Sequence, residues 1–149
     1  MRIFTRTRSS VYGVAYTLFL LAATMFPFRF HFTAAYFHHR VPTINWFPID
    51  PYTGDLDSRR TYADYVANIA LFVPFGFLGF KALWGSPKGR ILVMLAVGCI
   101  FSSGIEFTQL FTETRYTALS DMIFDTTGTT LGALLAAHLD RMFSEARSV

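Results

Sequence analysis

Long apolar runs constrain this chain more than any other feature of its sequence. The first lies between Arg8 and Arg29 and measures about 20 residues, or roughly 30 Å at helical rise, which matches one hydrocarbon core. Three further runs follow. Charged residues make up only 15% of the chain and gather between the runs instead of alternating with apolar residues. This distribution is typical of a membrane protein rather than of a soluble domain.

We therefore predict an all-α polytopic membrane protein in which residues 1–149 form one domain with four transmembrane helices. The predicted spans are residues 9–28, 62–84, 91–112 and 119–139, and a longer loop, residues 29–61, joins the first two. The basic start also resembles a secretory signal peptide. Its apolar stretch is longer than the usual signal core and further runs follow, so we expect it to remain in the protein.

The distribution of Lys and Arg predicts the orientation in the membrane. The N-terminal arm, the short loop after the second span and the tail carry eight of the thirteen, and the two remaining loops carry five over a greater length. The positive-inside rule then places both termini in the cytoplasm and loop 29–61 outside. The net charge of +3 suits anchoring to anionic lipid. We expect no nucleic-acid partner, because no basic motif with interleaved aromatics is present.

Polar residues from separate spans fall at one predicted depth. Glu106 comes about 15 residues along the third span, in the outer half of the bilayer, and Gln109 lies three residues on, on the same face. Asp121 and Asp125 stand at i and i+4 in the first turns of the fourth span. Asn68 in the second span has a similar depth. The sequence thus predicts one polar layer near the outer face.

Two arginines border this layer: Arg115 in the outer connection after the third span, and Arg29 at the end of the first. An ionised side chain facing lipid costs roughly 2.5–3.5 kcal/mol on insertion scales, so the acids should face one another, Arg115 or an outward-open cavity. The predicted pocket consists of Arg29, Asn68, Glu106, Gln109, Arg115, Asp121 and Asp125. The alternative is that these residues only join the helices through hydrogen bonds.

Small residues and one proline predict how the spans pack. Pro74 should kink the second span, and Gly76 should allow a close contact there. Gly128 and Gly132 form a G-x-x-x-G pair in the fourth span. This pair supports either packing within the chain or dimerisation.

Loop 29–61 is rich in aromatic residues, which suit the headgroup level, and residues 30–39 read as a short interfacial helix. The loop either caps the pocket or lies flat on the membrane. His31, His38 and His39 invite a metal interpretation, but no Cys or nearby carboxylate completes a ligand set. We predict interfacial histidines, no metal and no cofactor. The single cysteine, Cys99, excludes an intramolecular disulfide.

Three blocks of the sequence resemble the VanZ-like family of small bacterial membrane proteins. They are "NIALFVPFGFLGF" from Asn68, "SSGIEFTQLF" followed by Arg115, and "SDMIFDTTGTTLGALLA", within residues 62–139. The family pattern falls on Asn68, Phe72, Pro74, Gly76, Glu106, Gln109, Arg115, Asp121 and Gly128. Where the family usually has Asn in the last block, this chain has Asp125, so any role that needs a donated hydrogen bond there requires a protonated carboxyl group.

The resemblance implies a multi-pass protein of the bacterial cytoplasmic membrane. It also implies a link to low-level resistance to teicoplanin, a glycopeptide with a lipid tail that acts at the outer face of that membrane. Our first hypothesis is an outer-leaflet pocket that binds a membrane lipid or an amphiphile. The second is a membrane-embedded enzyme acting on an envelope lipid or glycan precursor, with Glu106 or Asp121 as general acid/base. The third is a scaffold or a transporter subunit that forms a homo-oligomer.

Overall fold

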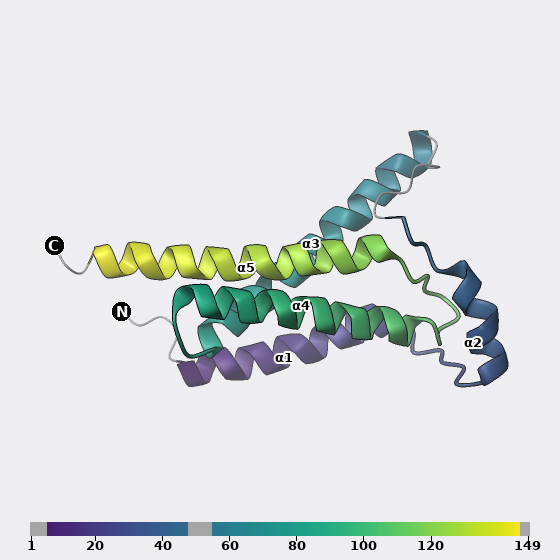
Figure 1. Cartoon of the computed structure of the whole chain (residues 1–149), viewed down its shortest axis with the longest axis horizontal. Helices are drawn as coiled ribbons and strands as arrows, with labels where there is room; N and C mark the ends of the chain where they lie inside the picture. Colours follow the sequence, from purple (N-terminus) through teal and green to yellow (C-terminus); the bar gives the residue numbers. More distant parts are fainter. Residues whose placement is uncertain (1–5, 48–54, 147–149) are drawn as a thin grey trace.

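The computed structural model describes residues 6–47 and 55–146; for residue 6 and residues 55–61 it describes the backbone only. The helices are α1 (Arg6–Met25), α2 (Ala34–Arg40), the 3-10 helix η1 (Val41–Thr43), α3 (Asp55–Ala82), α4 (Pro87–Gln109) and α5 (Leu119–Glu145) (Figure 1). Over these residues the only other regular pairings are two isolated β-bridges. The all-α prediction is therefore confirmed for the described part of the chain.

The helix bounds differ from the predicted spans mainly in two places. The helix α3 begins at Asp55 rather than at residue 62, and α5 continues to Glu145 rather than ending at residue 139. Length and composition mark two helical segments of the described chain as able to cross a membrane, Tyr62–Ala82 and Pro87–Gln109. Arginines at the start of α1 and three aspartates in α5 lower the hydropathy of those two helices. The number of spans stays a prediction.

The four long helices form a bundle, and α2 lies across one of its ends (Figure 1). The helices α3 and α5 run in one direction, whereas α1 and α4 run in the other. The start of α1 and the end of α5 consequently lie at the same end of the bundle, opposite α2. We call the α2 end the outer end, following the predicted orientation.

Glycines bring α3 and α5 into backbone contact. A Cβ atom at Gly128 or Gly132 would overlap the carbonyl oxygen of Ile69 or Val73 in α3, and one at Gly76 would overlap the backbone of Thr129 in α5. Only glycine permits such an approach. The G-x-x-x-G pair thus packs against α3 of the same chain. Of the two roles that the sequence allowed for it, packing within the chain and dimerisation, the structure shows the first. A homo-oligomer through another face stays a prediction.

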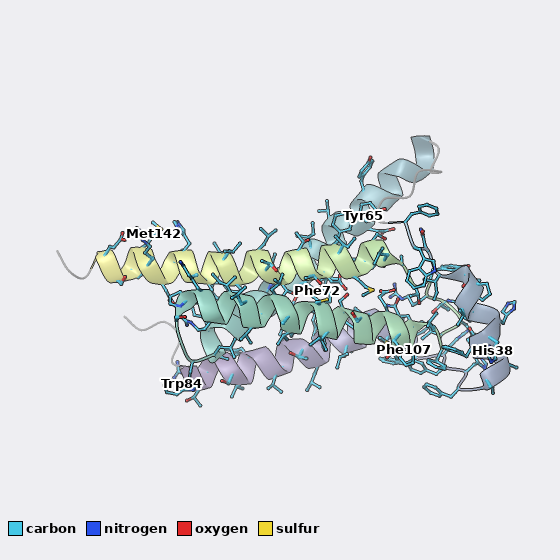
Figure 2. The ribbon with its side chains drawn as sticks, in the orientation of Figure 1. His38, Tyr65, Phe72, Trp84, Phe107 and Met142 are labelled. Atoms are coloured by element: carbon cyan, nitrogen blue, oxygen red, sulfur yellow. The ribbon has the colours of Figure 1, made fainter. Side chains whose placement is uncertain are left out.

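Apolar side chains point outward on all four long helices. Leu18 of α1, Val66 of α3, Ile100 of α4 and Leu134 of α5 are all exposed, Ile100 to 73%. The core contains Phe72, which lies between the helices (Figure 2), together with polar residues such as Ser102 and Thr129. The surface of a soluble domain rarely carries so many large apolar side chains, so this distribution suits a lipid environment.

At the end opposite α2, charged residues join three helices. Lys81 of α3 forms an ion pair with Asp140 of α5. Arg90 of α4 approaches Asp140 at 3.8 Å and lies over the ring of Phe80, 3.9 Å from its centroid. Ser86 caps α4 by accepting a hydrogen bond from Gly89, and Pro87 follows in the first turn, where a missing N–H costs nothing.

Candidate functional site: an acidic cavity at the outer end

A cavity of about 520 Å³ lies between the outer ends of α1, α3, α4 and α5. Six of the seven residues predicted for the pocket line it: Asn68, Glu106, Gln109, Arg115, Asp121 and Asp125. They come from α3, α4, α5 and the α4–α5 connection, so residues up to 57 positions apart meet in one space.

The seventh predicted residue, Arg29, does not line the cavity. Its guanidinium is exposed and lies 3.8 Å from the carboxylate of Glu113. His31 Nε2 approaches the same carboxylate at 2.5 Å. The segment after α1 therefore turns Arg29 toward the surface and away from the acids.

Glu106 has two structural connections to the start of α5. Its Oε2 accepts a hydrogen bond from the backbone N–H of Ala118 at 2.9 Å, and its carbonyl oxygen accepts one from Thr117 Oγ1 at 3.0 Å. The residue is only 3% exposed, yet it lines the cavity. Glu106 therefore serves the packing of the bundle as well as the wall of the cavity.

The two aspartates of α5 have different surroundings. Asp125 is buried and accepts a hydrogen bond from Ser102 Oγ at 2.7 Å, which joins α4 to α5. Asp121 lies one turn nearer the outer end, where the amide of Asn68 and the charge of Arg115 both interact with it. Both carboxylates interact electrostatically with Glu106, so the acids form one group.

The structure adds cavity residues that the sequence analysis did not select, among them Asp64, Asn45 and Tyr116. Asp64 precedes Asn68 by one helical turn on the same face of α3, and this i, i+4 spacing is a signal that identifies it. Asn45 comes from the loop after η1, and nothing in the local sequence indicates that it reaches the cavity.

The described part of loop 29–61 docks on the α4–α5 connection. The N–H of His31 donates to Phe111 O at 2.8 Å, and Tyr36 Oη donates to Thr112 O at 2.8 Å. Asn45 donates its N–H to Thr117 O at 3.0 Å and accepts from Leu119 at 2.8 Å. Of the two arrangements that the sequence left open, these contacts favour the cap over the cavity rim.

Aromatic side chains reinforce this docking. Phe37 of α2 stacks on Phe111 with ring centroids 5.5 Å apart, and Phe107 of α4 lies edge-on to Phe111 at 5.6 Å. Figure 2 shows Phe107 and His38 at this end, far from Trp84. The interfacial helix expected at residues 30–39 is α2, which begins later, at Ala34, because Thr33 caps it by accepting from the N–H of Tyr36.

Arg40, the last residue of α2, fixes the rim of the cavity. It is 7% exposed, donates from Nη2 to the carbonyl of Arg115 and lies over the ring of Tyr116, 5.2 Å from its centroid. Arg115 in turn donates from Nη2 to Ala23 O at 3.3 Å. Two cavity-lining residues are thus held in place from α2 and α1.

The histidines of the loop lie outside the cavity, with His31 beside Glu113 and with His38 and His39 exposed on α2. Across the described residues, no three His, Cys, Asp or Glu side chains are grouped closely enough to hold a metal ion.

Comparison with known families places the chain. A family model described as VanZ/LLP1 matches residues 13–140. The chain belongs to the VanZ/LLP1 family. The match extends over α1 and loop 29–61, beyond the three blocks in which the sequence showed the resemblance. No curated protein and no solved structure matches it.

The residues of the family pattern occupy two regions of the structure. Asn68, Glu106, Gln109, Arg115 and Asp121 line the cavity, whereas Phe72, Gly76 and Gly128 lie in the core beneath it. Pro74 lies inside α3, between Val73 and Gly76, the residues that contact α5. In this VanZ/LLP1 protein some residues of the family pattern therefore line the cavity, and the others form the helix contacts beneath it.

Proposed function

We propose that this VanZ/LLP1 protein is a multi-pass protein of the bacterial cytoplasmic membrane in which α1, α3, α4 and α5 all span the bilayer. The outward-facing apolar side chains on each of these helices support the proposal. So do the basic residues Lys81, Lys88, Arg90 and Arg141, which lie at the end opposite α2 and suit the cytoplasmic side. In this topology the cavity lies in the outer leaflet.

The proposed activity is binding of a membrane lipid or amphiphile, whose headgroup enters the cavity and whose tail stays in the bilayer. One observation carries this: a space of about 520 Å³, within the usual range for small-molecule sites, is lined by charged and amide side chains at the outer end of an otherwise apolar bundle. Polar groups at that depth are costly unless they meet a partner, and a headgroup supplies one.

Binding of this kind gives a physical basis for protection against teicoplanin, because the lipid tail of that drug anchors it to the same leaflet. The test uses a host without an outer membrane that carries empty vector, this protein, Glu106→Gln or Glu113→Gln. Susceptibility to teicoplanin and to vancomycin is measured at membrane levels matched by blotting. Glu113 is the control because it lies in the α4–α5 connection at the same end of the bundle but outside the cavity.

Protection against teicoplanin alone that is lost in Glu106→Gln and kept in Glu113→Gln supports the proposal. Equal protection by both variants contradicts a role for the cavity acids. No protection by the unchanged protein contradicts the resistance role, and the same cells are then compared for envelope lipids and glycan precursors by mass spectrometry. A new or missing product that depends on Glu106 or Asp121 favours the enzyme hypothesis instead.

A further inference from the structure

The charge of the cavity lining is strongly unbalanced. Among the residues whose side chains the structure describes, four carboxylates line it, those of Asp64, Glu106, Asp121 and Asp125, against the single basic side chain of Arg115. Arg115 is also held at the rim by its hydrogen bond to Ala23 O. One guanidinium therefore faces four acids, and the lining has capacity for further positive charge.

None of these four carboxylates forms an ion pair with a Lys, Arg or His in the described part of the chain. Glu106 and Asp125 are both more than nine-tenths buried, and the donors given for their carboxylates are neutral, the N–H of Ala118 and the hydroxyl of Ser102. An ionised carboxylate accepts about four hydrogen bonds, so both have capacity left toward the cavity. A buried carboxylate without a counter-charge is unfavourable, and a cationic ligand removes that cost.

The lining also distinguishes among cations. In the described part of the chain, no three carboxylates are grouped closely enough to coordinate a metal ion. A quaternary ammonium group favours open aromatic faces. Of the aromatic residues in the lining, Tyr65 stacks on Phe124 at 4.3 Å and Tyr116 lies against Arg40. A primary ammonium fits better, because its three N–H donors can be divided between a carboxylate and neutral acceptors of the lining, such as the amide oxygens of Asn68 and Gln109.

Building on the proposed function, we propose that the cavity recognises a protonated primary amine on the headgroup of its amphiphile. The amine pairs with an acid of the cavity lining, which includes Asp64 and Glu106. Arg115 at the rim has N–H donors beyond the one that it gives to Ala23 O, and these can meet an anionic group of the same headgroup. The ligand class is thus an amine-bearing zwitterionic or cationic amphiphile, and the amine enters as its charged form.

The test measures binding to the purified full-length protein in detergent by isothermal titration calorimetry. The probes are short-chain phosphatidylethanolamine, its N-acetyl derivative, which keeps the phosphate and tails but loses the charged amine, and free phosphoethanolamine, which lacks tails. The variants are Asp64→Asn, Glu106→Gln and the control Glu113→Gln. Asp64 is exposed at the cavity, so its replacement is the variant that disturbs packing least.

We expect phosphatidylethanolamine to bind at least about tenfold more tightly than its N-acetyl derivative, the effect of one charge-assisted contact. Asp64→Asn and Glu106→Gln should reduce this preference, and Glu113→Gln should keep it. Binding of free phosphoethanolamine equal to that of the lipid would support the amine site but contradict the need for tails.

Equal affinity for the two lipids overturns amine recognition while the proposed amphiphile binding stands. An amine preference that survives in both cavity variants also overturns this assignment, because another site then holds the amine. No binding of either lipid by protein that elutes as a single folded species contradicts the amine site, and the proposed function is then judged by the drug susceptibility test alone.

Discussion

The carboxylate of Glu106 near the end of α4 accepts a hydrogen bond from the backbone N–H of Ala118, the residue that precedes α5, at 2.9 Å. The same carboxylate lines the outer cavity. A structural role and the proposed binding role therefore meet in one side chain, and a substitution that removes both at once cannot separate them.

Glu106→Gln and Glu106→Leu separate these roles. Both remove the charge, but only Gln keeps an oxygen that can accept from Ala118. We expect Glu106→Leu to be less stable than Glu106→Gln by about 1–3 kcal/mol, the cost of an unpaired donor that is partly shielded from water. Unfolding in detergent followed by circular dichroism measures the difference. Equal stability would show that the Ala118 N–H finds another acceptor.

Ser102→Ala tests the hydrogen bond between α4 and α5. Its loss leaves Asp125 without the donor at 2.7 Å, and we expect a destabilisation of about 1–3 kcal/mol. Ser103→Ala is the control, since that hydroxyl donates within its own helix to Cys99 O. The effect of Ser102→Ala should shrink in an Asp125→Asn background, where no charge needs the donor. An undiminished effect in that double variant would assign the loss to packing.

Gly132→Ala should disrupt the contact between α3 and α5. The added methyl group meets the Val73 carbonyl, and overpacking of this kind typically costs about 1–3 kcal/mol. Gly104→Ala provides a matched control in a helix, because nothing lies within 4 Å of its added Cβ. That variant should be neutral or slightly stabilising, since Ala favours helix. Thermal stability in detergent gives both values, and similar losses in the two variants would contradict the close packing.

Single cysteines test the four-span topology in a Cys99→Ala background. Glu113→Cys lies at the outer end, whereas Lys88→Cys and Arg141→Cys lie at the other end. A membrane-impermeant maleimide added to whole cells should label the first, and it should label the other two only after the membrane is opened. Labelling of Lys88→Cys and Glu113→Cys from the same side would contradict a membrane-spanning α4.

Arg40→Ala should loosen the rim of the cavity. It removes the donor to the Arg115 carbonyl and the contact with Tyr116, so we expect faster hydrogen exchange of the backbone amides in residues 111–118. The opening free energy should fall by about 1–3 kcal/mol. Arg40→Lys should restore part of it. The exposed Arg29 supplies the control, Arg29→Ala, and an equal effect there would deny Arg40 its specific role.

The sequence predicted the helices well because their signals are local. Apolar runs of membrane length, with Pro and Gly at their ends, define α1, α3, α4 and α5 to within a few residues at most ends. Helical spacing also predicted that Asp121 and Asp125 share a face, and both line the cavity. Asp64 and Asn68 have the same i, i+4 spacing, so helical periodicity could also have identified Asp64 as a cavity residue.

The loop contributions could not be obtained in this way. Arg29 and Arg40 are both loop-region arginines, yet one is exposed beside Glu113 and the other is buried beneath Arg115. Asn45 reaches the cavity only because its backbone pairs with Thr117 and Leu119, more than 70 positions later in the chain. Hydrophobic periodicity in the sequence does not predict backbone pairing between such distant residues.

The sequence by itself determined which segments are helical, which residues are too polar to face lipid and that these residues lie at one level along their helices, because rise per residue and the cost of a charge in hydrocarbon are properties of the local chain. Tertiary structure alone decided that the acids line one space, that the glycine pair packs against α3, and that Arg40 of α2 holds the rim. Each of these depends on contacts between distant segments, whose geometry is fixed only when the bundle packs.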